Sequence, residues 1–589
     1  MKARNPRSST GIPYIILPGN LYVNSPQEIS EAVNSSFAAS FTIDRAGPVP
    51  NFPRLTTDSF GSVLFTLNDI QKRLSSIRPS LRPGPDGVPP ALFKLGGPDI
   101  GIFLLNLFTL SMKDSTFPVQ WKSSIVIPHH KKGPLYDTSC YRPINHTPIV
   151  SRLMERIVKE QIVEFLTSRN LISDRQHGFL KSRSCVTCQL DFLNHVTTAA
   201  DNGKAFITVF LDMTKAFDRV SHSLLIAKIR MFGIVDPLLS WLSSYLSKRS
   251  QRTDVNGHLS QPIPITSGVI QGSVLGPLLF LLYINDVFTT INHGTPFLFA
   301  DDIKIVYSFK PSSIDAALAT IADDLNSLDL WCNSWSMRFS AAKSTILSYR
   351  CSVPPGSLFL NGSALPNNHI VRDLGLQYSC TFNFSEQIFY QIAKARRSIG
   401  LIHRTFRLRD SKLNVYLSHT RPLLEYCPII FTHMRKSDRV ALESVQRSFT
   451  KQLVGVSSPL NYRERCELLH LEPLWLRRLK LNLCFLFNLL HGQAYSSCTR
   501  PSICPSTPYN LRYRELTLTV PRTRLALRYK FFLVVYSTIW NKLPVDVRSC
   551  PSLVQFKFAL RKLLDVPYVT QMKNYHLDIA RAYEVGFDF

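Results

Sequence analysis

Two adjacent aspartates, Asp301 and Asp302, stand in the middle of a mostly apolar stretch, residues 297–307. The apolar residues on both sides predict two short strands, with the aspartates at the turn between them. Asp is a common turn residue, and a solvated hairpin tip is the simplest interpretation. Two like charges without an obvious local partner are nevertheless costly, and a bound divalent cation would relieve that cost.

A third aspartate lies at the end of another apolar segment. Residues 206–213 predict a buried strand, and Asp212 stands near its end, where a carboxylate is a poor core residue. Carboxylates from two strands are suitable ligands for a pair of Mg²⁺ ions about 4 Å apart, which supports phosphoryl transfer. Asp212, Asp301 and Asp302 therefore predict such a site. One ion would lower the pKa of a primer 3′-hydroxyl, and the other would hold a triphosphate and the leaving pyrophosphate.

The charge of the chain indicates a polyanionic partner. Its 589 residues include 68 Lys and Arg but 41 Asp and Glu, a net charge of +27. Such an excess is typical of proteins that bind nucleic acid or an anionic membrane surface. The longest strongly apolar stretch, residues 274–284, is shorter than the roughly 20 residues of a spanning helix. The N-terminus lacks the apolar core of a signal peptide. We therefore expect no membrane partner.

The positive charge is densest after residue 381, where 32 basic residues accompany 14 acidic ones. One cluster comprises Lys394, Arg396, Arg397, Arg404, Arg407 and Arg409, and a second comprises Arg522, Arg524, Arg528 and Lys530. Helical spacing would place part of each cluster on one face, where it could hold an RNA template. A solvated helix surface is the alternative interpretation.

The order of predicted elements favours an α+β fold. Helical periodicity predicts helices over residues 149–170, 275–287 and 314–335, and these alternate with the predicted strands up to about residue 380. Helical patterns dominate from residue 381 onward. The twelve cysteines are scattered, which suggests reduced thiols inside a cell. The single CxxC, Cys185 and Cys188, has no second pair and is better explained as small buried side chains than as a zinc site.

Three sequence blocks follow one another along the chain in a recognisable order. They are Leu211-Asp212-Met213-Thr214-Lys215-Ala216-Phe217-Asp218, Gly268-Val269-Ile270-Gln271-Gly272-Ser273-Val274-Leu275-Gly276-Pro277 and Phe299-Ala300-Asp301-Asp302. Further blocks are Pro83-Gly84-Pro85-Asp86-Gly87, Lys131-Lys132-Gly133, Tyr141-Arg142-Pro143-Ile144, Gln176-His177-Gly178-Phe179, Asp373-Leu374-Gly375 and Trp540-Asn541-Lys542-Leu543-Pro544. In this order they resemble the reverse transcriptases of non-LTR (LINE-type) retrotransposons, near the jockey and chicken-repeat groups. The resemblance covers nearly the whole chain.

The resemblance implies a right-hand polymerase with fingers, palm and thumb, and a helical basic C-terminal domain. Residues 1–75 would be a linker remnant that precedes the polymerase, and residues 76–110 an N-terminal extension of the fingers. Residues 111–380 would form the fingers and palm, residues 381–475 a helical thumb, and residues 476–589 a basic nucleic-acid-binding region. Endonuclease activity would come from a missing upstream domain or from another protein.

The resemblance also implies roles for individual residues. Asp212, Asp301 and Asp302 would be catalytic and hold two Mg²⁺ ions, and Lys343 would protonate pyrophosphate. Lys131, Lys132 and Arg142 would bind the triphosphate, Phe217 would be the steric gate against a 2′-hydroxyl, and Gln271 and Gly272 would lie along the nucleotide. Four of these residues have a simpler alternative: Phe217 as plain core, Lys131 and Lys132 as a solvated loop, and Lys343 as a surface lysine. Departures from the family at Asn145, His146, Ser182 and Ser340 remove no metal ligand.

The function implied is an RNA-directed DNA polymerase that extends a primer 3′-hydroxyl on an RNA template. Its partners would be RNA, a DNA primer or target DNA, and deoxynucleoside triphosphates. It would work in the nucleus, with assembly of a ribonucleoprotein in the cytoplasm. An RNA-dependent RNA polymerase shares the palm carboxylates, but Phe217 and the Phe-Ala-Asp-Asp form argue against it. A catalytically silent nucleic-acid-binding relic is the second alternative, although all three aspartates are present.

Overall fold

A computed structural model describes residues 11–42, 49–496 and 517–563 of the chain. The chain forms two compact units, which are described separately. The first comprises residues 1–179, 213–292 and 325–340, and the second comprises residues 180–212, 293–324 and 341–589. Helix α10 (Ile314–Ser334) runs through both ranges. No helix among the described residues combines the length and the apolar character needed to cross a membrane.

The first unit is built on a five-stranded sheet. Strand β3 pairs antiparallel with β4 and parallel with β6, and β6 also pairs with β7 and β8. Its elements are β1 (Ile15–Leu17), β2 (Leu21–Val23), α1 (Pro26–Ala38), α2 (Leu67–Ser75), α3 (Pro90–Leu95), α4 (Gly97–Lys113), β3 (Ser123–His130), β4 (Tyr141–His146), α5 (Ile149–Ser168), α7 (His222–Met231), α8 (Leu238–Leu246), β6 (Arg249–Val255), β7 (His258–Leu259), β8 (Ile263–Ile265) and α9 (Gly276–Ile284).

Part of the segment predicted to be a linker remnant is folded. Helix α1 buries Ile29, Val33 and Phe37 in a small core shared with the sheet. The fully buried Asn34 accepts hydrogen bonds from Gln251 Nε2 and from the Thr253 hydroxyl of β6, each at 3.1 Å. Apolar burial and satisfied polar groups thus tie this segment to the first unit.

The second unit is built on a four-stranded antiparallel sheet in the order β11-β5-β10-β9. Its elements are α6 (Cys185–Asp201), β5 (Ala205–Leu211), β9 (Thr295–Phe299), β10 (Asp302–Phe309), β11 (Thr345–Tyr349), β12 (Phe359–Leu360), β13 (Ser363–Ala364), β14 (Ile370–Asp373), β15 (Leu376–Ser379), α11 (Ser385–Thr405), α12 (Arg409–Val415), α13 (Arg421–Glu425), α14 (Lys436–Val454), α15 (Tyr462–Leu468), α16 (Leu474–Leu490), α17 (Ala526–Tyr529), α18 (Phe532–Lys542), α19 (Val545–Arg548) and α20 (Leu553–Leu563).

The structure confirms the mixed helix and sheet class and the individual elements predicted around the aspartates. The predicted strands are β5, β9 and β10, and the predicted helices over 149–170, 275–287 and 314–335 are α5, α9 and α10. The division into fingers, palm and thumb stays a prediction.

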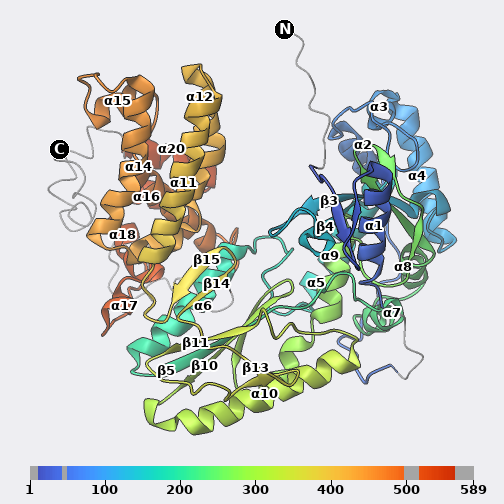
Figure 1. The fold of residues 1–589 in the computed structure, drawn as a ribbon, viewed down its shortest axis with the longest axis horizontal. Coiled ribbons are helices and arrows are strands. Elements are labelled where there is room, and N and C mark those ends of the chain that lie inside the picture. The colour runs from blue at the N-terminus through green and yellow to red at the C-terminus, as the bar shows by residue number, and fades with distance from the viewer. Residues whose placement is uncertain (1–10, 43–48, 497–516, 564–589) are drawn as a thin grey trace. The chain divides into compact units, whose positions relative to one another are not determined.

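One hydrophobic core connects the sheet of the second unit with the helices that follow it. The core includes Phe192 of α6, Phe206 of β5, Ile388 of α11, Phe487 of α16 and Trp540 of α18. Figure 1 shows α6 beside strands β5 and β10. The domain boundary predicted at residue 475 falls inside helix α16, whose side chains belong to this core. The described part of the predicted C-terminal region therefore packs as part of the second unit.

A buried ion pair crosses the second unit. Lys304 of β10 donates hydrogen bonds to Asp373 (2.6 Å) and to Gln189 Oε1 (2.8 Å), and the two ionic side chains are 3% and 9% exposed. The Gln189 amide in turn donates to Asp373 (3.0 Å), and the Tyr378 hydroxyl donates to Gln189 Oε1 (2.5 Å). Burial opposes the charge on Lys304, but the Asp373 carboxylate outweighs it and raises the pKa of the ammonium. Each charge is buried because the other compensates it.

We expect Asp373→Ala to lower the free energy of unfolding by about 3–5 kcal/mol, because it leaves Lys304 buried without its counter-ion. Urea unfolding followed by circular dichroism measures the loss. Glu467→Ala is the control: it removes one partner of the exposed Arg463–Glu467 pair in the same unit and should cost at most about 1 kcal/mol. Equal losses in the two variants would contradict the stabilising role of the buried pair.

Candidate active site

The three predicted aspartates lie at neighbouring strand ends of the second unit. Asp212 directly follows β5, Asp302 begins β10, and Asp301 lies in the turn between β9 and β10. In the antiparallel β5–β10 pair Leu211 lies opposite Ile303, so the next position on each strand end is Asp212 and Asp302. Ala300 takes a left-handed conformation (φ 55°), which closes the tight turn. The pairing register thus brings together carboxylates that are about ninety residues apart in sequence.

The charges of these carboxylates act on one another. Desolvation by the surrounding protein, followed by repulsion from Asp301, Asp373 and Asp212, raises the pKa of Asp302 to about 7. The Asp302 side chain still has a solvent-exposed surface, and Asp212 is 38% exposed. The site therefore holds a group of carboxylates that repel each other and that a ligand from solvent can reach.

Lys343 lies beside the first of these aspartates. Its ammonium donates to Asp212 Oδ1 at 3.1 Å, and its side chain is 64% exposed. Lys343 precedes β11, which pairs with β5 through Thr345 and Phe210, and Ser344 Oγ accepts from the Asp212 backbone N–H at 3.3 Å. Lys343 is thus a surface lysine, but one that the sheet places at a predicted catalytic residue.

The other predicted site residues belong to the first unit. Phe217 is half-buried: its ring stacks on Phe280 (centroids 4.4 Å apart, planes at 16°) and meets the edge of Phe179 (6.0 Å, 81°). The two rings fix the orientation of Phe217 while part of its surface stays accessible. This arrangement is compatible with a gate as well as with partial burial in the core.

Gln271 and Gly272 form a loop against β4. The Asn145 N–H donates to the Gln271 carbonyl at 2.7 Å. Gly272 has φ 118°, and a Cβ there would lie 2.3 Å from the Asn145 carbonyl oxygen, so only glycine fits. Asn145, one of the departures from the family pattern, is buried and accepts from Ser124 Oγ at 2.9 Å.

Three basic residues lie at the ends of β3 and β4. Lys131 and Lys132 are exposed just after β3, and Arg142 is exposed on β4, opposite His129 in the pairing register. Lys131 also acts electrostatically on Asp218, which places it near the Gln271 loop. In the first unit, Lys131 and Phe217 therefore lie near the loop formed by Gln271 and Gly272.

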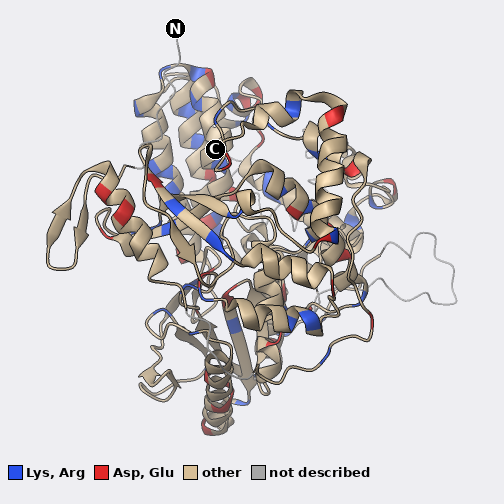
Figure 2. Ribbon diagram, turned by 90° about the vertical axis from the view of Figure 1, so that its right-hand side faces the viewer, with Lys and Arg blue, Asp and Glu red and all other residues tan. Residues whose placement is uncertain are grey.

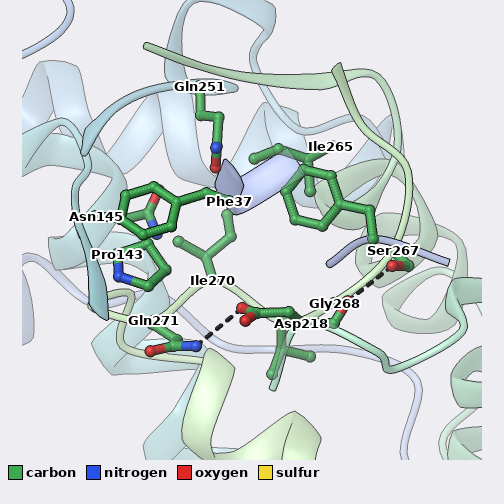
Figure 3. A pocket seen from close by; sticks show the side chains of 12 residues that line it. Phe37, Pro143, Asn145, Asp218, Gln251, Ile265, Ser267, Gly268, Ile270 and Gln271 are labelled. Atoms are coloured by element: carbon green, nitrogen blue, oxygen red, sulfur yellow. Dashed lines mark hydrogen bonds between the residues drawn. The ribbon is translucent and has the colours of Figure 1, made fainter. Parts of the chain in front are cut away.

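A pocket in the first unit occupies this region (Figure 3). Its lining includes Phe37, Asn145, Asp218, Ser267, Gly268 and Gln271. Gln271 Nε2 donates to Asp218 Oδ1 at 2.9 Å, and Ser267 Oγ donates to the Asp218 carbonyl at 2.7 Å. Asp218 belongs to the block around Asp212, but the sequence suggested no role for it.

Glu155 is a supporting residue that the sequence analysis missed. This fully buried carboxylate of α5 accepts from the N–H groups of Val274 (2.8 Å) and Leu275 (3.0 Å) and from the Tyr245 hydroxyl (3.2 Å). It thereby caps the start of α9 and holds the end of the Gln271 loop. The sequence does contain a signal for this residue. Glu155 is a single acid on the apolar face of the predicted helix, four residues after Ser151 and three before Val158.

The donor atoms at the three aspartates suit a hard divalent cation, since carboxylate oxygens are the ligands that Mg²⁺ prefers. Among the described residues, no group of three or more His, Cys, Asp or Glu side chains converges tightly enough to form a preassembled metal site. The mutual repulsion at Asp302 is nevertheless the electrostatic state that a cation relieves.

Comparison with known proteins gives independent information. Residues 129–378 match the family described as reverse transcriptase (RNA-dependent DNA polymerase). The chain is 30% identical to the probable RNA-directed DNA polymerase from transposon BS of Drosophila melanogaster, over 47% of this chain and 31% of the relative. It is 26% identical to the RNA-directed DNA polymerase from mobile element jockey of the same species, over 66% and 44%.

A third relative is the Pol polyprotein from the type-1 retrotransposable element R1 of Bradysia coprophila, 24% identical over 55% of this chain and 32% of the relative. In each of these three matches the chain covers less than half of the relative's own length. The family match includes Asp212, Asp301 and Asp302 and the loops around Phe217 and Gln271. Residues 129–378 therefore match the reverse transcriptase family, and the chain is similar to RNA-directed DNA polymerases of mobile elements such as jockey and the X-element, which supports a LINE-type reverse transcriptase.

Proposed function

We propose that this chain is an RNA-directed DNA polymerase that adds deoxynucleotides to a primer 3′-hydroxyl on an RNA template. The observation that carries the proposal is the β5–β10 register, which sets Asp212 beside the Asp301–Asp302 turn within the matched reverse transcriptase region. The names of the relatives, which describe RNA-directed DNA polymerases, agree with it.

In the proposed reaction, the primer 3′-oxygen bonds to the α-phosphorus of the nucleotide while the bond to the pyrophosphate oxygen breaks. Asp212, Asp301 and Asp302 would hold two Mg²⁺ ions, and bound ions would neutralise the carboxylates and the phosphate charge. The 3′-hydroxyl gives up its proton to solvent. Lys343, held at 3.1 Å from Asp212, donates a proton to the leaving pyrophosphate.

Residues of the first unit would select the nucleotide. The basic Lys131, Lys132 and Arg142 suit triphosphate oxygens, since charge-assisted hydrogen bonds are the strong ones. The fixed ring of Phe217 would exclude a 2′-hydroxyl, and the Gln271–Gly272 loop would lie along the nucleotide. On the family resemblance we also propose nuclear activity, with the 3′-hydroxyl supplied by an endonuclease in another part of the protein or in another chain.

The first test replaces the turn aspartates singly. We expect Asp301→Asn and Asp302→Asn each to abolish primer extension on an RNA template while RNA affinity persists, because only a ligand carboxylate is removed. Asp323→Asn is the matched control, an exposed aspartate of α10, and it should extend like the wild type. Wild-type extension by both turn variants would contradict the two-metal assignment. A wild-type chain that binds RNA but extends no primer would support the silent-relic alternative.

The proposed metal site also predicts a pH dependence. A carboxyl must lose its proton before it can hold Mg²⁺, and the pKa of Asp302 is raised to about 7. Mg²⁺ affinity should therefore fall as the pH is lowered from about 8 to about 6, and binding near neutral pH should release protons. Calorimetry in two buffers of different ionisation enthalpy measures both quantities. Asp302→Asn should weaken binding and remove the proton release, whereas a pH-independent affinity in the wild type would refute the assignment.

A third prediction concerns sugar selection. Phe217→Val should relax discrimination against ribonucleotides, because the smaller side chain leaves room for a 2′-hydroxyl. The measurement is the ratio of kcat/KM for one deoxynucleotide to that for its ribonucleotide, in wild type and variant. Phe179→Leu, which changes the ring packed against Phe217, controls for loss of aromatic packing. An unchanged ratio in an active Phe217→Val enzyme would show that Phe217 is not the gate.

The surface of α11 suits an RNA backbone. Lys394, Arg397 and Arg404 are exposed at spacings that place them on one face of this helix, and Figure 2 colours the Lys and Arg positions blue along the ribbon. The second basic cluster is partly occupied by the protein itself. Arg528 donates to Asn194 Oδ1 (2.8 Å) and Thr197 Oγ1 (2.9 Å) of α6, so it serves packing within the second unit. We therefore propose α11, rather than Arg528, as a template contact.

Reversing the three charges of this face should weaken RNA binding. For Lys394→Glu, Arg397→Glu and Arg404→Glu together, the slope of log affinity against log salt should fall by about 2, since each phosphate contact contributes about 0.7. The control reverses three exposed charges elsewhere in the unit, at Lys310, Arg561 and Lys562. Equal slopes for the two triple variants would mean that only net charge matters. Such point changes leave the shared core intact, which deletion of residues 476–589 would not.

A further inference from the structure

Asp218 lies in the wall of the pocket of the first unit, where two loops meet (Figure 3). One loop carries Phe217 and the other carries Gln271. The Val269 N–H donates to the Phe217 carbonyl at 2.8 Å, and the Gly268 N–H donates to the Val220 carbonyl at 2.7 Å. The Asp218 carbonyl accepts from Ser267 Oγ at 2.7 Å. The backbone of Asp218 is thus fixed independently of its carboxylate.

Gly268 shows how closely the two loops approach each other. A Cβ at this position would lie 2.9 Å from the Asp218 Cα and from the Phe217 carbonyl oxygen, and its φ is 90°. Only glycine allows the chains to pass at this distance. The Asp218 carboxylate is therefore presented to Gln271 at a defined position, with little freedom to move away.

The chemistry of the pair fixes the direction of the Gln271 amide. An ionised carboxylate only accepts hydrogen bonds, so the nitrogen of Gln271 must face Asp218, and its carbonyl oxygen faces another direction. Burial raises the pKa of Asp218 to about 6, and the opposing effects of Gln271, Lys215 and Lys131 limit the rise, so the carboxylate is ionised at pH 7.5. Without the Asp218 carboxylate, the Gln271 amide would lose the hydrogen bond that sets this direction.

We infer that Asp218 is a positioning residue for nucleotide selection: it holds the Gln271 amide so that its carbonyl oxygen is available as an acceptor toward the incoming nucleotide. This inference rests on the proposed function. Asp218 acts through Gln271 and does not itself contact the nucleotide. Asp218 also joins the loop that carries Phe217 to the loop that carries Gln271. Both loops would therefore respond to the same nucleotide.

A double-mutant cycle on the full chain tests this coupling. Asp218→Ala and Gln271→Ala should each raise the KM for dTTP about tenfold, as for loss of a hydrogen bond to a charged group, with a smaller change in kcat. The double variant should be no worse than Gln271→Ala alone, because Asp218 acts only through that side chain. Asp218→Asn, whose oxygen can still accept from Gln271, should restore most of the affinity.

Asp254→Ala is the matched control. It removes a buried aspartate of β6 in the same unit, outside the pocket lining, and should leave the KM unchanged. Thermal unfolding of every variant separates a positioning effect from loss of structure. The inference would be overturned if the two single losses in affinity multiply in the double variant. It would also be overturned if Asp218→Asn is as impaired as Asp218→Ala.

Calorimetric titration of the same proteins with dTTP distinguishes failure of the inference from failure of the proposed function. A wild-type protein that binds dTTP without extending a primer would refute the polymerase proposal. In that case the same double-mutant cycle, measured as affinity for dTTP, would still decide the role of Asp218. A wild type that neither extends nor binds would overturn both.

Discussion

The pairing of β5 with β10 is the constraint on which the candidate active site depends. Asp212 and the Asp301–Asp302 turn are far apart in sequence, and only the register that sets Leu211 opposite Ile303 makes them neighbours. A slip of one residue would turn every side chain of a strand to the other face of the sheet. Every side chain of β5 is buried, so such a slip would disrupt close packing on both faces of the strand. The same burial that stabilises the sheet therefore fixes the geometry of the candidate active site.

Buried polar groups perform the corresponding task for the loops. Glu155 fixes the start of α9 and with it the end of the Gln271 loop. Lys304 and Asp373 connect β10 with the β14–β15 hairpin, and Asp373 contributes to the raised pKa of Asp302. Such groups are expensive to bury alone and favourable only in their native partnership. In the native arrangement Glu155, Lys304 and Asp373 each find such a partner.

The strands β5, β9 and β10 and the position of the three aspartates at their ends could be predicted from the sequence because their signals are local. Apolar runs that end in carboxylates at 212 and 301–302 indicate charged groups at strand ends, and the ordered motifs identified the family. The partnership of Glu155 with residues 274–275 and that of Lys304 with Asp373 could not be predicted, since each joins segments with no common local pattern. The fold of residues 15–38 was also missed. Its Ser- and Asn-rich composition resembles a linker, whereas the buried Ile29, Val33 and Asn34 find their partners only once β6 is present.

The hydrophobic core of the second unit has a consequence for synthesis of the protein. Phe192 of α6 and Phe206 of β5, in the core of the four-stranded sheet, share that core with side chains as late as Trp540 and Phe556. When β10 leaves the ribosome, most of the helices that cover this apolar surface are not yet made. The nascent chain must therefore carry an exposed hydrophobic face through much of its translation, the period in which such surfaces are open to aggregation or chaperone binding. A stop codon between these points would leave the three aspartates of the candidate site present but the core beneath their sheet incomplete.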